Sequence, residues 1–203
     1  MAISKKDLFK TFTGAEFNAK FPNIVFVKLT NQTENHFNLQ FKDGLIVDHN
    51  KFYPYEQCKP GGIYFCQYNQ ASHWIDYGQG TMQWVRRVLI PDDAKVYIEP
   101  DKFKANKIIL LPKQPLWEDA TICKALCEYT VAYFPYVTNQ TPEICLIAVE
   151  KDPYLLRLIK NQTKEVCYAA AKKNPKLLSL SNYIRDDEMR EKIRIKLAYN
   201  MPL

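Results

Sequence analysis

The apolar residues in the last part of the chain recur with a period of 22 residues. Each period contains an apolar stripe at positions i, i+3 and i+4, the spacing that places side chains on one face of a helix. The stripes are Cys123, Leu126 and Cys127; Cys145, Ala148 and Val149; and Cys167, Ala170 and Ala171. The pattern therefore predicts three helices of one design, each buried along its stripe.

A residue that can cap a helix N-terminus stands four positions before the first cysteine of each stripe. These residues are Asp119, Thr141 and Thr163. Each offers a side-chain oxygen to the backbone N–H groups of the first helical turn. A second apolar segment follows each helix, beginning near Val131, Pro153 and Pro175. Asn-Gln-Thr at 139–141 and 161–163 is then the turn between units, so these glycosylation-like motifs are interpreted as structural.

Two short helices in 22 residues cannot bury an apolar face of their own, so neighbouring units must stack. Residues 113–203 are therefore predicted to form an all-α array of helix-turn-helix repeats. The segment Asn182 to Asn200 breaks the pattern and is rich in charge, which is typical of a terminal capping helix. The recurring cysteines have neither a CxxC pair nor a nearby histidine, so they are interpreted as core residues and not as metal ligands.

Residues 1–112 follow a different pattern, with short β-rich runs between turn signals. Strands are predicted at 24–30, 38–41, 63–66, 82–90, 96–98 and 107–111. Residues 5–20 are predicted to form one or two short helices capped by Ser4, and residues 70–77 a further helix. The run 96–98 is expected to continue the strand 82–90 beyond the turn at Pro91. This mixture predicts an α+β domain that ends at the proline-bounded linker 112–115.

Composition and charge narrow the functional classes. With 47% hydrophobic and 25% charged residues, the chain resembles an ordinary globular protein. The net charge of +6 divides into +3 on each side of Pro112 without a basic block, which disfavours a dedicated nucleic-acid-binding protein. The sequence contains no apolar run of the roughly 20 residues that span a bilayer, and its start lacks the apolar stretch of a signal peptide. We therefore expect no membrane partner.

Five side chains in the first domain could serve catalysis or metal binding: His36, His49, His73, Cys58 and Cys66. Their spacings along the chain match no common metal-ligand pattern, so no metal site is predicted. A Cys–His nucleophile pair would need two of them to converge in the fold. We interpret the histidines as loop residues and the cysteines as buried thiols.

One segment resembles the ADP-ribosyltransferase-like superfamily. The similarity is to that family's central strand and helix. It covers Gly61-Gly62-Ile63-Tyr64-Phe65, followed by Ala71-Ser72-His73-Trp74 and Tyr77-Gly78. The run Val27 to Thr30 stands where the family has its first strand.

This resemblance implies an NAD-dependent activity and a set of site residues. Tyr64 would stack on the nicotinamide, with Gly62 and Thr30 beside it in the cofactor site. Lys28 stands in place of a family His or Arg, although Lys lacks the planar donor geometry of Arg. Glu99 would orient the ribose and stabilise the transition state.

A second resemblance is to the N-terminal module of mimivirus-type giant-virus ankyrin-repeat proteins. Its matching pieces are Phe37 and Phe41 before Lys42-Asp43-Gly44-Leu45, then Cys58-Lys59-Pro60-Gly61-Gly62, then Ile90-Pro91-Asp92-Asp93-Ala94-Lys95-Val96-Tyr97. This likeness covers roughly Phe26 to Leu110 and implies a viral origin, without any catalytic residues.

The sequence thus favours a non-enzymatic viral interaction protein in the host cytoplasm or the virion, without a cofactor. It would join a degenerate transferase-like domain to a helical array that binds a host or viral protein. The alternatives are an NAD-dependent ADP-ribosyltransferase and, third, a nucleic-acid-binding protein.

Overall fold

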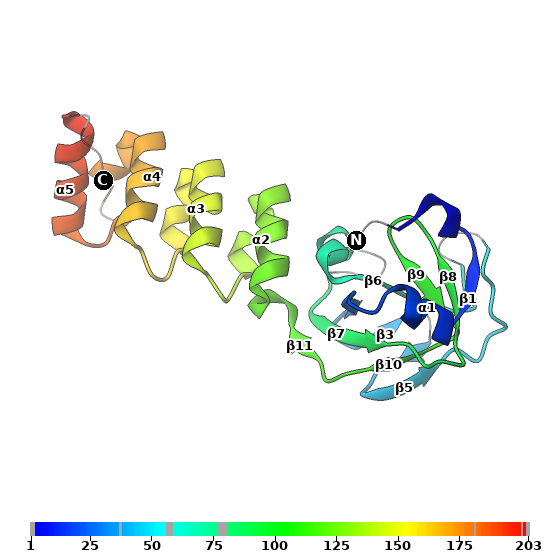
Figure 1. Ribbon diagram of the computed structural model, residues 1–203. Coiled ribbons are helices and arrows are strands. Elements are labelled where there is room, and N and C mark those ends of the chain that lie inside the picture. The colour runs from blue at the N-terminus through cyan, green and yellow to red at the C-terminus, as the bar shows by residue number, and fades with distance from the viewer. Residues whose placement is uncertain are drawn as a thin grey trace. The chain divides into compact units, whose positions relative to one another are not determined.

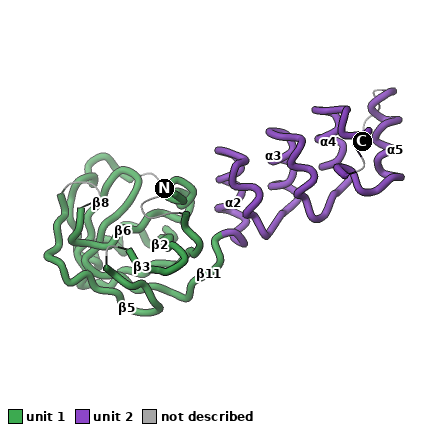
Figure 2. Tube along the Cα trace, turned by 180° about the vertical axis from the view of Figure 1, so that it is seen from behind, with its two compact units in different colours: residues 1–116 green, residues 117–203 purple. Residues whose placement is uncertain are grey.

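In the computed structural model, an antiparallel sheet and a series of short helices occupy separate parts of the chain (Figure 1). The structure describes residues 3–36, 38–55, 59–76, 81–180, 182–199 and 201. They fall into two compact units, residues 1–116 and 117–203 (Figure 2). The fold class is mixed α+β, as predicted.

The boundary between the units lies after Leu116 and not after Pro112. The segment expected to be a linker contains a short strand, β11 (Gln114–Pro115), which pairs with β7 (Trp84–Leu89). The backbone N–H of Leu116 also donates to the carbonyl of Gln83, 2.9 Å away. These hydrogen bonds attach residues 114–116 to the sheet of the first unit.

Nine strands of the described residues join in one antiparallel sheet. Eight of them follow each other across the sheet, and β11 is attached beside β7. The order is β1 (Thr11–Thr13), β8 (Lys95–Ile98), β9 (Phe103–Ala105), β6 (Ile63–Gln67), β2 (Phe26–Thr30), β7, β10 (Lys107–Leu110) and β5 (Gly44–Val47). A separate hairpin consists of β3 (Asn35–His36) and β4 (Leu39–Gln40).

Strand β8 does not continue β7, so that expectation was wrong. The chain turns at Pro91, whose carbonyl accepts the Ala94 N–H, and β8 then pairs with β1 and β9. The start of helix α1 (Gly14–Lys20) holds this turn, because the Gly14 N–H donates to the Ala94 carbonyl. Only glycine fits there, since a Cβ on Gly14 would lie 1.8 Å from the Pro91 oxygen.

The N-terminal helices also differ in detail from the expectation. A 3₁₀ helix η1 (Lys5–Asp7) and α1 are separated by β1, and the side chain of Ser4 makes no capping hydrogen bond. Thr13 caps α1 instead, in a reciprocal capping box with Glu16. The helix expected at 70–77 is a 3₁₀ helix, η2 (Tyr68–Trp74), and residues 77–80 lie outside the described part of the chain.

A cluster of phenylalanines forms the centre of the first unit. Phe17 of α1 lies 4.9 to 6.2 Å, between ring centroids, from four other rings. These rings belong to Phe21, Phe26, Phe65 and Phe103. The cluster thus connects the helix to β2, β6 and β9, and its edge-on pairs add to the burial of apolar area.

The second unit alternates α-helices with 3₁₀ helices. After η3 (Leu116–Glu118) come α2 (Ala120–Tyr129), η4 (Val131–Tyr136), α3 (Pro142–Lys151), η5 (Pro153–Leu158), α4 (Lys164–Lys173), η6 (Pro175–Ser179) and α5 (Asp187–Ala198). Each α-helix contacts the next one along the chain. The predicted second helix of each 22-residue unit is therefore a 3₁₀ helix, a form that occurs in such short pieces.

The predicted stripes and caps lie where the sequence placed them. All nine stripe positions, from Cys123 to Ala171, are buried. The oxygens of Asp119, Thr141 and Thr163 accept backbone N–H groups of α2, α3 and α4. The terminal helix α5 buries Ile193 and is capped by Asp186.

The glutamine in each Asn-Gln-Thr turn has a structural role that the repeat pattern did not predict. The Gln140 side chain donates to the Leu158 carbonyl at 3.1 Å and accepts the Lys160 N–H at 2.9 Å. Gln162 makes the corresponding pair of bonds with the Tyr183 carbonyl and the Arg185 N–H. Each glutamine therefore satisfies backbone groups of the following turn.

We expect Gln140→Ala to lower the free energy of unfolding by about 1–2 kcal/mol, because it leaves a backbone donor and a backbone acceptor without partners. The matched control is Asn161→Ala in the next turn, where an exposed side chain is removed and the expected change is within about 0.5 kcal/mol. Urea denaturation measures both variants. Equal losses in the two would contradict the role assigned to Gln140.

Candidate functional site

A pocket of about 610 Å³ opens where two neighbouring strands separate. Strands β2 and β6 pair through only two residue pairs, Phe26 with Gln67 and Val27 with Cys66. Beyond them β2 follows β7 as far as Thr30, whereas the other end of β6 follows β9. Lys28 and Leu29 from one diverging strand, and Ile63 and Tyr64 from the other, line the space between them.

Further walls come from segments outside the two strands. The hairpin β3–β4 supplies His36 and Leu39, and Phe41 follows it directly. The turns 48–50 and 59–62 also contribute to the lining, as do Trp74, Met82 and Lys102. Asp48 joins these turns, because its carboxylate accepts the backbone N–H groups of Asn50 and Gly62 at 2.9 and 2.7 Å.

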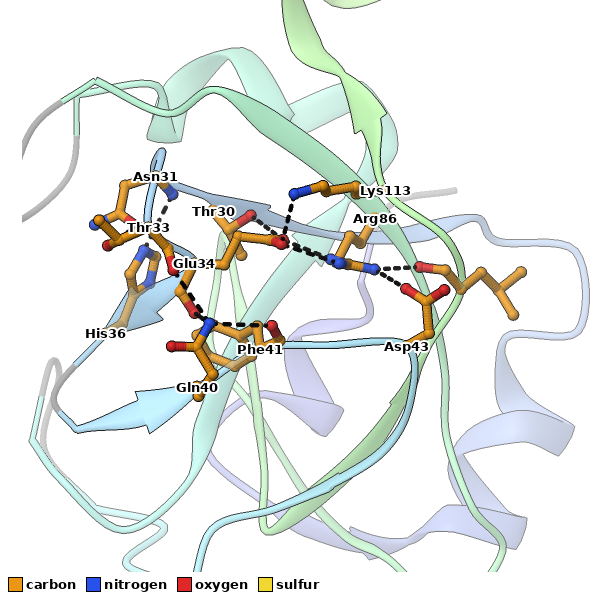
Figure 3. Close-up of polar contacts among 11 residues, drawn as sticks. Thr30, Asn31, Thr33, Glu34, His36, Gln40, Phe41, Asp43, Arg86 and Lys113 are labelled. Atoms are coloured by element: carbon orange, nitrogen blue, oxygen red, sulfur yellow. Dashed lines mark hydrogen bonds and ion pairs between the residues drawn. The ribbon is translucent and has the colours of Figure 1, made fainter.

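A buried ion-pair network holds the hairpin wall against the sheet (Figure 3). Arg86 of β7 is 3% exposed, and its Nε and Nη2 lie 2.7 and 3.1 Å from the two oxygens of Glu34. Its Nη1 lies 2.5 Å from Asp43 and donates to the Leu111 carbonyl. Thr30 and Lys113 also donate to Glu34, at 3.1 and 3.0 Å. The network thus clamps both ends of segment 34–43.

Glu34 is charged in the folded protein. Burial alone would raise its pKa, but the hydrogen bonds from Arg86 and Lys113 outweigh that effect and hold the pKa below its ordinary value. The hydrogen bonds from Arg86 to Glu34 and to Asp43 raise the pKa of the Arg86 guanidinium, although burial opposes this effect. The pair is therefore ionised on both sides, as a buried pair must be to be stable.

Lys28 is a half-buried cation in the pocket wall. Its Nζ lies 4.8 Å from the centroid of the Phe41 ring, and within the described part of the chain it has no carboxylate partner. The register of β2 and β7 places it directly opposite Arg86. Burial lowers the pKa of the Lys28 amine to about 8, an effect that the nearby Cys66 partly offsets.

His36 is neutral at physiological pH. Burial, and then the charge of Lys28, lower the pKa of its imidazole to about 4. Its Nε2 accepts the backbone N–H of Asn31 at 3.3 Å, so the remaining proton is assigned to Nδ1. The ring lies edge-on to Phe41, with 5.4 Å between the centroids.

The structure brings three of the five predicted transferase residues to one pocket. Lys28, Tyr64 and Gly62 line it, whereas Glu99 and Thr30 do not appear in its described lining. Thr30 is buried and bound to Glu34.

Glu99 is buried at the turn after β8, where burial raises the pKa of its carboxyl group and Lys102 partly opposes the shift. The distance between the Lys102 Nζ and Glu99 Oε2 is 3.6 Å. The Nζ atoms of Lys102 and Lys104 lie 5.0 and 5.1 Å from the Tyr64 ring centroid. The Tyr64 ring therefore makes cation–π contacts with two ammonium groups, and one of them, that of Lys102, also lies near the Glu99 carboxylate.

The cysteine and histidine candidates converge only in part. Cys66, His36 and His49 line the pocket, His73 is exposed, and Cys58 lies outside the described residues. Burial raises the pKa of Cys66 to about 12, so this group is a thiol and not the thiolate that nucleophilic attack requires. No cluster of three or more His, Cys, Asp or Glu suited to a metal ion occurs among the described residues.

Several residues that shape the pocket were not singled out from the sequence. Arg86 lies in the strand run Trp84-Val85-Arg86-Arg87-Val88-Leu89. Because side chains alternate between the two faces of a strand, Arg86 shares a face with Trp84 and Val88, and a charged residue between two apolar ones on that face could have indicated a buried ion pair. Lys102 carried no such signal, because its position depends on the turn between β8 and β9.

Comparison with known proteins finds relatives in a giant virus. The uncharacterized protein R869 of Acanthamoeba polyphaga mimivirus is 30% identical over 109 residues, which are 51% of this chain and 76% of that protein. The putative ankyrin repeat proteins R868 and R838 of the same virus are 30% and 31% identical over 104 and 118 residues. These alignments cover about half of this chain, and 50% and 41% of the two relatives. No family model and no solved structure matches the chain.

No helix in the described residues has the length and apolar character needed to cross a membrane.

We expect Glu34→Gln to reduce the free energy of unfolding by about 3 kcal/mol, because it leaves Arg86 buried without its main counter-charge. Asp43→Asn removes the second carboxylate of the network, which is 62% exposed, and should cost less than about 1 kcal/mol. Guanidinium unfolding distinguishes them. A cost for Asp43→Asn equal to that for Glu34→Gln would show that Glu34 is not the main partner.

We expect Lys28→Met to raise the free energy of unfolding at pH 7 by about 1–3 kcal/mol, because an apolar side chain replaces a half-buried charge. The amine titrates at about 8 in the folded protein and near 10.5 when unfolded, so the folded state gives up this proton first. The wild type should therefore gain stability relative to the variant as the pH rises from 8 to 10.5.

Urea unfolding at pH 7, 9 and 10.5 measures this window. Lys95→Met, which removes an exposed lysine of β8, reports the effect of losing one surface charge. A stability difference between wild type and Lys28→Met that does not change with pH would contradict the depressed pKa.

Proposed function

The chain belongs to the same family as protein R869 of Acanthamoeba polyphaga mimivirus, and from that premise we propose that it is a non-enzymatic, viral protein-interaction module. Two further relatives are described as putative ankyrin repeat proteins, a class of repeat proteins that binds partners through stacked units. We place its action in the host cytoplasm or the virion, with a host or viral protein as its partner.

In this proposal the second unit is an all-α array of 22-residue repeats. The α-helices begin at Ala120, Pro142 and Lys164, which are 22 residues apart. A 3₁₀ helix follows each of them, so that each repeat consists of an α-helix and a 3₁₀ helix. Neighbouring repeats share their buried stripes, and the charged helix α5 covers the last one. A stack of this kind presents the same positions of successive repeats side by side.

The observation that carries the proposal is an exposed apolar position that recurs with the repeat. Tyr136, Leu158 and Leu180 stand 22 residues apart and are 60%, 37% and 42% exposed. Tyr136 and Leu158 are the last residues of η4 and η5, and Leu180 directly follows η6. The residues two positions earlier in each repeat, Phe134, Leu156 and Leu178, are buried. We call the exposed set the stripe 136/158/180. Repeated exposed apolar side chains on one element of a stacked array favour a protein-binding surface.

We expect the triple variant Tyr136→Ser, Leu158→Ser, Leu180→Ser to lose its protein partners. Tagged wild-type protein, added to extracts of infected host cells, should retain a specific set that the stripe variant captures at least about tenfold less, since buried apolar anchors dominate binding energy. Quantitative mass spectrometry measures the captured proteins. A control variant with Leu45, Tyr129 and Ile195 changed to Ser removes exposed apolar side chains elsewhere and should capture as the wild type does.

The capture experiment and a melting-temperature measurement separate the alternatives. Capture by the stripe variant at the wild-type level would contradict the interaction surface. If the capture of proteins disappears after nuclease treatment and weakens steeply with salt, the hypothesis of a nucleic-acid-binding protein would be favoured instead. A rise in melting temperature with NAD, removed by Tyr64→Ala, would favour the ADP-ribosyltransferase alternative.

A further inference from the structure

The pocket between β2 and β6 lies within the first unit. From its charges and walls we infer that it binds a small organic anion with an apolar or aromatic body, whose anionic group pairs with Lys28. The cavity of about 610 Å³ lies within the size range of small-molecule sites. This site is separate from the stripe 136/158/180, so either proposal can fail without the other.

The pocket lies where the strand pairing changes partners. The ladder between β2 and β6 ends at Val27 and Cys66, because each strand then follows a different neighbour. On the open side, the Arg86–Glu34 ion pair fixes the hairpin that carries His36. A site whose walls are held in this way requires little reorganisation when a ligand binds.

The charges of the pocket favour an anion. Among the described lining residues three are lysines, and Asp48 is the acidic one. The Asp48 carboxylate is already used by the N–H groups of Asn50 and Gly62. Lys102 has the buried Glu99 within 3.6 Å. Lys28 has no carboxylate partner among the described residues, and its Nζ lies instead 4.8 Å from the centroid of the Phe41 ring.

A second polar group points to the same ligand chemistry. The Nε2 atom of His36 accepts the Asn31 N–H, so its Nδ1–H is a neutral donor in the pocket wall near Lys28. Within the described residues no acceptor for this Nδ1–H is present. An ammonium group and an imidazole N–H together suit a carboxylate or a phosphate group.

The remaining walls favour an apolar body on the anion. Leu29, Phe41, Ile63 and Met82 provide apolar lining, with the Phe41 ring next to Lys28, and Trp74 adds a second aromatic ring. A bare inorganic ion would leave this surface exposed to water. An aromatic ring attached to the anionic group would cover it, and burial of apolar area would add to the charge pairing.

The direct test compares phenyl phosphate with benzyl alcohol and with inorganic phosphate, each up to about 10 mM, by ligand-observed NMR and calorimetry. Phenyl phosphate should bind the wild type at least about tenfold more tightly than either of the other two probes. Lys28→Met keeps the length of the side chain and should bind phenyl phosphate and benzyl alcohol equally well. Lys95→Met should keep the wild-type preference.

Three outcomes would overturn the proposal. They are no binding of phenyl phosphate in this range, equal binding of inorganic phosphate, and a preference for phenyl phosphate that persists in Lys28→Met. If Lys28→Met does not fold, amine labelling of the wild type decides the question by mass spectrometry. Phenyl phosphate should protect Lys28 at least about fivefold while the labelling of Lys95 stays unchanged, and unprotected Lys28 would contradict the site.

Discussion

The short ladder between β2 and β6 is the constraint on which the first unit depends. Two residue pairs, Phe26 with Gln67 and Val27 with Cys66, join the strands around β7 to the strands around β9. Phe26 and Phe65 stand at this junction and pack against the same phenylalanine cluster, so the core compensates for the small number of backbone hydrogen bonds. The divergence of the two strands beyond the ladder creates the pocket. The junction and the site therefore have one origin.

The second unit follows a different rule, because none of its short elements is stable alone. An isolated helix of about ten residues is marginal in water, so α2, α3 and α4 depend on the faces that they share. Backbone groups of these short elements are also satisfied by side chains from neighbouring repeats. The side chains of Gln140 and Gln162 satisfy the next turn, and Lys151 and Lys173 donate to the Glu128 and Glu150 carbonyls of the preceding helices.

Local patterns predicted local structure, and the misses have identifiable causes. The stripe that begins at Cys123 needed only helical periodicity, which any buried helix must obey. The capping box of α1 has a local sequence signature, a threonine (Thr13) three residues before a glutamate (Glu16), whereas the side chain of Ser4 caps no helix. The departure of β8 from β7 depends on contacts with β1 and β9, and these involve residues that are distant along the chain.

The site was less predictable because it lies where two strands separate. The sequence of a single segment does not show which strands will pair or where their pairing ends. The resemblance to the ADP-ribosyltransferase-like superfamily pointed to Lys28 and Tyr64. The pocket that these two residues share results from the separation of β2 and β6. Buried Arg86 has two carboxylates, whereas Lys28, directly opposite it in the register, has an aromatic ring and a neutral imidazole. A half-buried, uncompensated ammonium group costs stability, which an apolar residue at the same position would avoid. That cost is explained if the missing negative charge is supplied by a ligand.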